Sequence, residues 1–315
     1  MIISFIIIGK NVEGTIDKTL SSIYKLIDAA NFDFYEVIYV DSNSQDSTIN
    51  IVNNYNNVKK FKVWGKPNAA IARNIGANNS KGDILFFIDG DMEIIVDSTL
   101  DILKRNQFND EVYMASDFYD FNYVANQCVS KKLRYNLNKD EYDYQMGGFF
   151  IIAKKLWDLN GGMRSCFKRS QDLDFSLRMA NMGYYLIKYK NPCIVHHTID
   201  YMDNRRFIKD LLRGNYLFPS LLIKYNLLNK HVRNLLFRQI TAIALSIIII
   251  LSLLLKSSLI LLSYLGILLF KIIIRKELKD YPKYLIIYFL LDLNFVFSTF
   301  FYWPVSEYIK NDISN

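Results

Sequence analysis

The chain has 315 residues, of which 51% are hydrophobic, and a formal net charge of +7. All of the excess positive charge follows Asp200, where 15 Lys and Arg stand against 8 Asp and Glu. Because this basic third is also the most apolar, we expect a membrane surface as its partner and exclude nucleic acid. The three cysteines have no paired spacing, which favours reduced thiols. The apolar start of the chain is short and lacks a basic segment, so it predicts a strand and not a signal peptide.

The first half of the chain alternates strand-like and helix-like patterns. Strands are expected at 2–8, 36–40, 62–64 and 84–88, and helices at 14–30, 47–55 and 68–79. This order predicts an α/β fold with a mostly parallel central sheet and helices on both faces. No Gly-x-Gly-x-x-Gly follows the first strand, which argues against a dinucleotide-binding domain. Residues 113–189 should contain short strands, a Gly147-Gly148 turn and a helix over 171–183.

The apolar run 84–88 ends in two carboxylates one residue apart, Asp89 and Asp91. At the carboxyl end of a buried strand, such a pair lies where open α/β sheets bind ligands. The two charges repel unless a cation joins them, and Mg²⁺ or Mn²⁺ carrying phosphate suits carboxylate ligands. The Asp-Gly-Asp triplet is weakly specific by itself, since Asp and Gly are common in turns.

The C-terminal third contains three apolar runs, at 239–255, 257–274 and 284–305, flanked by basic residues. They predict a membrane region over 235–305 with about three hydrophobic helices. The first two runs are short, so either two tight crossings or one hairpin dipping into a leaflet fits them. The flanking cations place the N-terminal domain in the cytosol. Residues 204–227 alternate basic and apolar side chains, which favours a helix lying on the membrane surface over an ordinary packed helix.

Four segments together resemble a known family. They are Ile-Ile-Ile-Gly-Lys-Asn-Val-Glu at 6–13, Val-Asp-Ser-Asn-Ser-Gln-Asp-Ser-Thr at 40–48, Ala-Ile-Ala-Arg-Asn-Ile-Gly at 70–76 continuing to the triplet at 89–91, and Gly161-Gly162 followed by 171–184. In this order and spacing the chain resembles a family 2, GT-A-fold, inverting nucleotide-sugar glycosyltransferase with a C-terminal membrane anchor. The resemblance covers about residues 1–200. It implies a GT-A domain over 1–230, a Rossmann-like α/β fold followed by transmembrane helices and a tail at 306–315.

The resemblance implies roles on the donor side of the site. Asn11, Glu13, Asp41, Arg73 and Asp89 would bind the nucleotide sugar, with Asp41 reading the nucleobase or ribose. Asp41 equally suits an Asx turn that caps the next helix. Arg73 equally suits a solvated charge on a helix.

Further residues are expected around the diphosphate. Asp91, with Asp89 beside it, would hold the Mg²⁺ or Mn²⁺ that neutralises the departing nucleoside diphosphate. Similar enzymes often carry a histidine near this metal, so His196 or His197 is a candidate, although the sequence does not choose between them. Arg213 could pair with the diphosphate or with a lipid headgroup.

On the acceptor side the resemblance implies that Asp172 is the general base of inverting transfer. The family has a Glu-Asp pair at this helix N-terminus, and this chain has Gln171-Asp172. Asp172 and Asp174 also suit helix capping and compensation of the helix dipole; we take Asp174 as structural. Gly147 and Gly148 resemble the glycines of an acceptor loop.

The expected activity is sugar transfer from a nucleotide sugar, UDP-linked, to a hydroxyl of a lipid-linked or glycolipid acceptor on the cytosolic face of a bacterial or archaeal plasma membrane. Such a reaction belongs to cell-envelope polysaccharide or glycolipid biosynthesis. One alternative is transfer to a polyprenyl phosphate, which is already ionised and needs no base. Another is a catalytically inactive membrane scaffold, which the Gln171 departure keeps open. The sugar, the nucleotide and the oligomeric state stay open.

Overall fold

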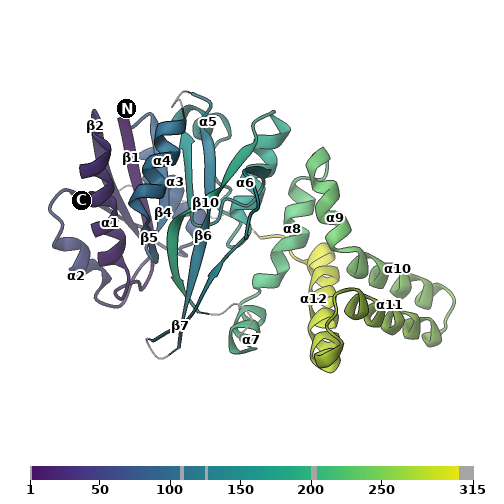
Figure 1. The fold of residues 1–315 in the computed structure, drawn as a ribbon. Coiled ribbons are helices and arrows are strands. Elements are labelled where there is room, and N and C mark those ends of the chain that lie inside the picture. Colours follow the sequence, from purple (N-terminus) through teal and green to yellow (C-terminus); the bar gives the residue numbers. More distant parts are fainter. Residues whose placement is uncertain (1, 107–109, 125–126, 200–203, 305–315) are drawn as a thin grey trace. The chain divides into compact units, whose positions relative to one another are not determined.

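The computed structural model describes residues 2–106, 110–124, 127–199 and 204–304 (Figure 1). The chain forms two compact units, one ending at Arg206 and the other comprising Phe207–Val305. The boundary expected near residue 230 therefore falls inside unit 2, and the expected surface helix groups with the C-terminal helices. The tail at 306–315 lies outside the described residues.

Unit 1 is built on one mixed sheet with the strand order β3-β2-β1-β4-β9-β6-β10-β5. Its strands are β1 (Ile2–Gly9), β2 (Phe34–Asp41), β3 (Val58–Lys62), β4 (Ile84–Asp89), β5 (Met92–Ile94), β6 (Tyr113–Val124), β7 (Gln127–Leu133), β8 (Glu141–Asp143), β9 (Phe149–Ala153) and β10 (Leu186–Thr198). The first four strands are parallel, as expected, and β6 and β10 form a second parallel pair. Antiparallel β9 joins these two parallel groups by pairing with β4 and β6.

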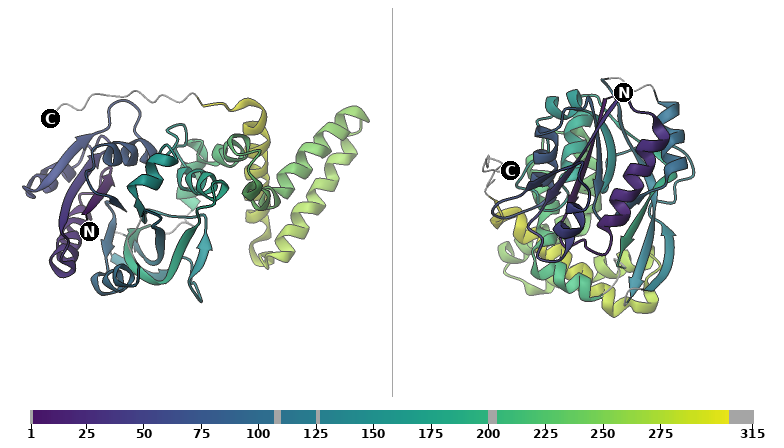
Figure 2. Two further views of the ribbon diagram at one scale, coloured as in Figure 1. Left: turned by 90° about the horizontal axis from the view of Figure 1, so that it is seen from above. Right: turned by 90° about the vertical axis from the view of Figure 1, so that its left-hand side faces the viewer.

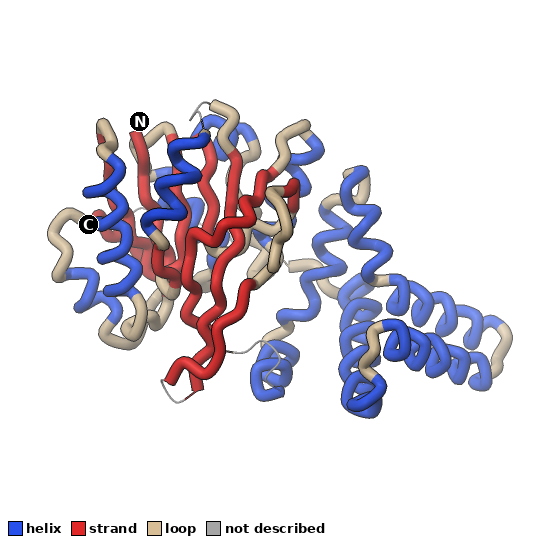
Figure 3. Tube along the Cα trace, viewed as in Figure 1, coloured by secondary structure: helices blue, strands red, loops and turns tan. Residues whose placement is uncertain are grey.

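Helices cover both faces of this sheet, as Figures 1 and 3 show. On one face lie α1 (Ile16–Ala30) and α4 (Val96–Arg105); on the other lie α3 (Ala69–Asn78), α5 (Lys154–Leu159) and α6 (Gln171–Asn181), with α2 (Thr48–Asn53) following β2. The sequence patterns did not predict α4 or α5. They also placed the third strand too late, because β3 ends at Lys62 and Trp64 is 53% exposed.

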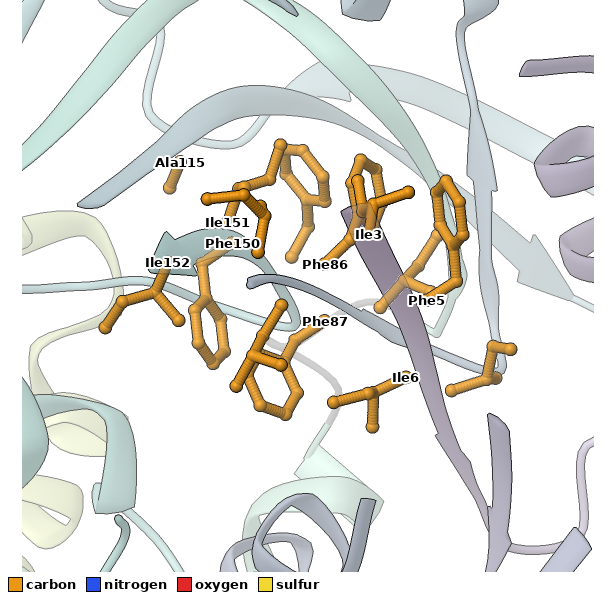
Figure 4. Packing of buried hydrophobic residues seen from close by; sticks show 14 of the residues in the cluster. Ile3, Phe5, Ile6, Phe86, Phe87, Ala115, Phe150, Ile151 and Ile152 are labelled. Atoms are coloured by element: carbon orange, nitrogen blue, oxygen red, sulfur yellow. The ribbon is translucent and has the colours of Figure 1, made fainter. Parts of the chain in front are cut away.

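The core fixes the carboxyl end of β4, where the two carboxylates follow. Every residue of β4 up to Ile88 is buried, which explains its uninterrupted apolar run. Phe87 stacks on Phe150 with ring centroids 4.6 Å apart and lies at the same distance from Trp157 of α5. Figure 4 shows Phe87 and Phe150 packed among Ile3, Phe86 and Ile152. Dense packing of this kind leaves the strand end little freedom.

Unit 2 is helical. It contains most of α7 (Asn204–Leu212), which begins three residues before the boundary, and α8 (Phe218–Tyr225), α9 (Arg233–Arg238), α10 (Ile240–Leu254), α11 (Leu261–Ile274) and α12 (Tyr281–Phe301). The single surface helix expected at 204–227 is two helices, because Gly214 adopts φ +70° between α7 and α8. Buried residues of α10, α11 and α12 form a separate core, in which Tyr264 donates to Asp292 at 2.7 Å.

Among the described residues, one helix, Leu278–Phe301, is long and apolar enough by length and composition to cross a membrane. A second candidate combines Lys230–Arg238 with Ile240–Leu254, but the two parts meet at a bend of 74°. With 15 and 14 residues, α10 and α11 are each shorter than the roughly 20 residues that a span needs.

Candidate active site

A cleft of about 270 Å³ opens at the carboxyl ends of β1, β2 and β4. The N-terminus of α3 forms its other wall, where the Asn68 side chain accepts from the Ile71 N–H at 3.0 Å. Its polar lining includes Lys10, Ser42, Asn68, Asp89 and Asp91. A concave site at the strand ends of an α/β sheet, with convergent polar groups, is where a ligand is expected.

Asn11 and Glu13 join the first two loops of the cleft to each other. The Asn11 amide oxygen accepts the Gln45 backbone N–H at 2.8 Å, and the Glu13 carboxylate accepts the Ser47 N–H at 2.8 Å. The side-chain oxygens of Asn11 and Glu13, which we expected to bind the donor, thus accept hydrogen bonds from the neighbouring loop and stabilise the wall of the cleft.

Asp41 ends β2 directly before Ser42, which lines the cleft. It is 3% exposed, and its carboxylate accepts the Ser44 backbone N–H at 3.0 Å. This is the Asx-type turn that the sequence offered as an alternative. The turn holds the carboxylate at the end of β2.

Arg73 is buried and does not act as a solvated helix charge. It is 2% exposed, and its guanidinium donates to Asp89 Oδ1 at 2.7 Å. Burial raises the pKa of Asp89 to about 6, with Asp91 adding to the rise and Arg73 opposing it. Arg73 therefore orients Asp89 at the rim of the cleft.

Gly148 packs directly against the other oxygen of Asp89. A Cβ at this position would lie 2.3 Å from Asp89 Oδ2 and 2.6 Å from Met92 Cε. Only glycine leaves room for the Asp89–Arg73 pair. The neighbouring Gly147 adopts φ +71°, which disfavours any other residue.

We predict that Gly148→Ala displaces Asp89 and lowers both donor affinity and turnover. Overpacking of this kind costs about 1–3 kcal/mol of folding stability. Thermal unfolding and donor titration measure the two effects. Gly14→Ala is the matched control, because nothing lies within 4 Å of its added Cβ. Wild-type donor affinity in Gly148→Ala would contradict the assignment.

The structure distinguishes the two adjacent histidines by strand alternation. His196 Nε2 lies 3.5 Å from Asp91 Oδ2, because β5 pairs with β10 and sets His196 opposite Met92. His197 points the other way, where its ring contacts Glu93 at 3.3 Å and Tyr123 at 2.9 Å. Of the two imidazole rings, it is therefore that of His196 that lies beside the Asp91 carboxylate, whereas His197 contacts Asp91 through its backbone N–H.

Asp120 and Arg134 contact Nδ1 of His196, the ring nitrogen on the other side of the ring from Asp91. His196 Nδ1 lies 2.7 Å from Asp120 Oδ1, and Arg134 contacts the same oxygen at 2.5 Å. Burial pushes the pKa of Asp120 upward, but hydrogen bonds from His196 and Arg134 hold it below its usual range. Sequence reasoning missed both residues, since the pairing of β6 with β10 brings Asp120 to His196, and the pairing of β6 with β7 brings Arg134, which follows β7.

The side chains present fit a divalent cation held jointly by protein and substrate. Within the described ranges no three His, Cys, Asp or Glu residues form a ready metal group. Asp91 and His196 nonetheless present a carboxylate oxygen and an imidazole nitrogen side by side, a donor pair that suits Mn²⁺ and leaves positions for phosphate. A carboxylate behind the other ring nitrogen, as Asp120 provides, is the usual support of a metal-binding histidine.

Asp172 lies in the first turn of α6, across the Gly147-Gly148 turn from Asp89. Burial raises its pKa, although the backbone N–H groups of Leu173 and Gly147 and the charge of Arg73 oppose the rise. A carboxyl with a raised pKa accepts a proton more readily than an ordinary aspartate. The side-chain oxygen of Gln171 is buried and has no hydrogen-bond partner among the described residues.

Asp174 is structural, as expected. It is fully buried and pairs with Arg164 at 2.8 Å and with Arg178 at 3.1 Å.

Beyond Asp172, the structure adds Lys188, a buried lysine that the sequence did not single out. It pairs with Asp143 and lies 3.5 Å above the Tyr135 ring, beside Gly147. Arg213 follows α7 in unit 2, and its pairing with the diphosphate stays a prediction.

Comparison with known proteins identifies the chain. The model of glycosyl transferase family 2 matches residues 4–172. Poly(ribitol-phosphate) beta-N-acetylglucosaminyltransferase TarP of Staphylococcus aureus (strain N315) is 33% identical over 87 residues, which are 26% of this chain and 25% of that protein. The crystal structure of S. aureus TarS 1–349 has a TM-score of 0.50 at 17% identity, covering 71% of this chain and 65% of that one. At this identity the TarS likeness shows the fold alone, and the chain spans only part of either relative. The family model covers more than half of the chain, which therefore belongs to glycosyl transferase family 2 and is a GT-A-fold glycosyltransferase.

Proposed function

We propose that this glycosyltransferase moves a sugar from a UDP-sugar to a hydroxyl of a lipid-linked acceptor, with inversion, at the cytosolic face of a membrane. The observation that carries the proposal is the Gly147-Gly148 turn between two carboxylates. Gly148 packs against Asp89 at the donor cleft, and the Gly147 N–H donates a hydrogen bond to the Asp172 carboxylate. Donor and acceptor groups thus meet across one turn.

In the proposed reaction Asp172 takes the proton of the acceptor hydroxyl as the oxygen attacks the anomeric carbon. The attack comes from the side opposite the diphosphate, so the sugar inverts. Asp91 and His196 would hold Mg²⁺ or Mn²⁺, which supplies charge neutralisation for the departing diphosphate. Arg73 keeps Asp89 oriented and balances the carboxylates around the reacting centre.

The donor is proposed to be UDP-linked, with Asp41 reading the nucleoside at the β2 end of the cleft. TarP is named as a beta-N-acetylglucosaminyltransferase. Inversion of an α-linked UDP-GlcNAc yields a β-linked product, which makes UDP-GlcNAc the first donor to test. The aligned quarter of TarP supports this choice without extending to its acceptor.

The lipid-linked acceptor is proposed from unit 2. Residues 207–305 carry 12 Lys and Arg against 4 Asp and Glu, and they contain a helix apolar enough to cross a membrane. This combination suits an anionic membrane surface. An acceptor attached to lipid would be concentrated there beside the enzyme. A hydroxyl acceptor is favoured over a polyprenyl phosphate, because only the hydroxyl needs Asp172.

The test supplies membranes containing the full chain with labelled nucleotide sugars and MnCl₂. We expect transfer of label into the lipid fraction from one UDP-sugar, and a product whose anomeric configuration is opposite to that of the donor. Retention of configuration would overturn the inverting mechanism. Binding of UDP-sugars without transfer or hydrolysis would favour the inactive scaffold, and label on a polyprenyl phosphate would replace the hydroxyl acceptor.

A further inference from the structure

The C-terminal end of α12 is held by α8. Lys224 of α8 donates to the carbonyl oxygens of Ser298 at 2.7 Å and Tyr302 at 2.9 Å, which satisfies groups that a helix end leaves open. Ser220 donates to the Ser298 hydroxyl at 2.6 Å, and Phe218 meets Tyr302 edge to face. In Figure 1 the two helices lie side by side within unit 2. Whatever side of a membrane α8 occupies, the end of α12 occupies too.

The chain cannot cross a membrane between unit 1 and α8. Strand β10 ends at Thr198 and α8 begins at Phe218. The 19 residues between them include seven charged ones, at 200, 203, 205, 206, 209, 210 and 213. A span needs about 20 mostly apolar residues. Therefore α8, and with it the C-terminal end of α12, lies on the side of the catalytic unit.

The other end of α12 follows a basic segment. Arg275, Lys276, Lys279 and Lys283 stand at 275–283, and all four are exposed. If α12 crossed the bilayer with its C-terminal end on the catalytic side, these four cations would lie on the opposite side. The distribution of Lys and Arg around membrane segments argues against that orientation. Although α12 is about 31 Å long, its contacts and flanking charges therefore oppose a crossing.

The remaining helices do not run parallel to α12. Figure 1 and the left view of Figure 2 both show α12, in yellow, at an angle to the α10–α11 hairpin and against its base, so all three helices cannot stand upright in one bilayer. The hairpin arms are about 22 Å and 21 Å long, less than the hydrocarbon thickness of about 30 Å. The most exposed apolar side chains of the hairpin gather near its tip, among them Leu253, Leu254 and Leu259.

One face of α12 is apolar and exposed, although Phe289 on it also meets the Tyr264 ring of α11 with centroids 6.4 Å apart. This face carries Ile286, Phe289, Leu293, Phe297 and Phe300, each at least 42% exposed and spaced by three or four residues. The opposite face carries Tyr288, Asp292 and Ser298, which are buried. Such a stripe, next to a basic segment, suits a helix that lies in the membrane surface.

We propose that unit 2 is monotopic: α12 lies along an anionic leaflet with both ends on the catalytic side, while the tip of the α10–α11 hairpin enters the bilayer. This deepens the proposed membrane-linked function and rests on it, since the same leaflet would hold the acceptor. Of the two arrangements that the first two apolar runs left open it takes the hairpin, and it replaces a crossing of α12 with an attachment to one side of the membrane.

The test maps the two ends of α12 with a membrane-impermeant maleimide on the full-length chain in cells and in inverted vesicles. Lys279→Cys reports the N-terminal end, and Ser314→Cys reports the segment after the C-terminal end. Both are made in a Cys128→Ser background, because Cys128 is the exposed native thiol and Cys166 and Cys193 are buried. Wild-type Cys128 serves as the reference for the catalytic side.

We expect both reporter cysteines to be labelled in inverted vesicles, as Cys128 is, and to remain unlabelled in intact cells. Labelling of Lys279→Cys and Ser314→Cys from opposite sides would show that α12 crosses, and would overturn the monotopic arrangement while leaving membrane attachment intact. Release of the full chain by high salt or carbonate would instead remove the membrane-linked function itself. The two failures are thus distinguishable.

Discussion

Asp172→Asn is expected to lower the rate of sugar transfer by about 100-fold or more, the usual scale of general-base loss. The amide keeps the shape of the side chain at the start of α6 but cannot take the acceptor proton. Donor binding should be retained, because Asp172 lies on the acceptor side of the Gly147-Gly148 turn. Initial transfer rates and donor-induced thermal stabilisation measure the two properties separately.

Asp172→Asn should also change how the rate of sugar transfer depends on pH. Burial raises the pKa of Asp172, so the base is protonated and inactive up to a higher pH than an ordinary aspartate would be. The wild-type rate should therefore fall on acidification through this raised pKa, and Asp172→Asn should lose that limb of the profile. Gln171→Ala is the matched control and should reduce the rate much less. A wild-type rate in Asp172→Asn would place the base elsewhere or make the acceptor a phosphate.

Asp91→Ala is expected to abolish most of the metal-dependent transfer, by about 100-fold or more, since neutralising the leaving diphosphate is worth several kcal/mol. Folding should survive, because the Asp91 side chain is 39% exposed and its backbone bond to His197 does not need the carboxylate. The measurement is transfer rate against MnCl₂ concentration, with thermal unfolding as the check on folding. Full activity of the wild type in EDTA would refute the metal assignment.

Three further variants test which side chains around Asp91 contribute to metal binding. His196→Ala should raise the metal concentration needed for half-maximal rate, and His197→Ala should not, because its ring contacts Glu93 and Tyr123. Asp120→Asn should weaken metal affinity by about 10–100-fold through its hold on His196. An equal effect of the two histidine variants would show that the contacts of His196 are structural.

The local sequence determined those features whose cause is local. Largely apolar runs predicted β1, β2 and β4, because a strand buried on both faces is apolar along most of its length. The buried polar residues Ser4 and Glu36 of β1 and β2 bond to each other. The same runs located the edge of the sheet where the cleft opens, since Asp89 and Asp91 follow the last apolar residue of β4 and line that cleft. The helix expected at 68–79 is α3, and the structure adds its cap, since Asn68 accepts the Ile71 N–H. Apolar, basic composition separated the C-terminal third from the rest.

Tertiary structure decided whatever depends on partners distant in the chain. Periodicity showed that His196 and His197 face opposite ways but not which way, and the choice came from β10 pairing with β5 and β6. Burial of Arg73 against Asp89 and the support of His196 by Asp120 likewise join residues 16 and 76 positions apart. Helix α12 has the length and composition of a span, and its contacts with α8, taken together with the basic residues before it, argue against a crossing. Hydrophobic pattern records whether a side chain is buried, whereas strand register and helix packing determine what it is buried against.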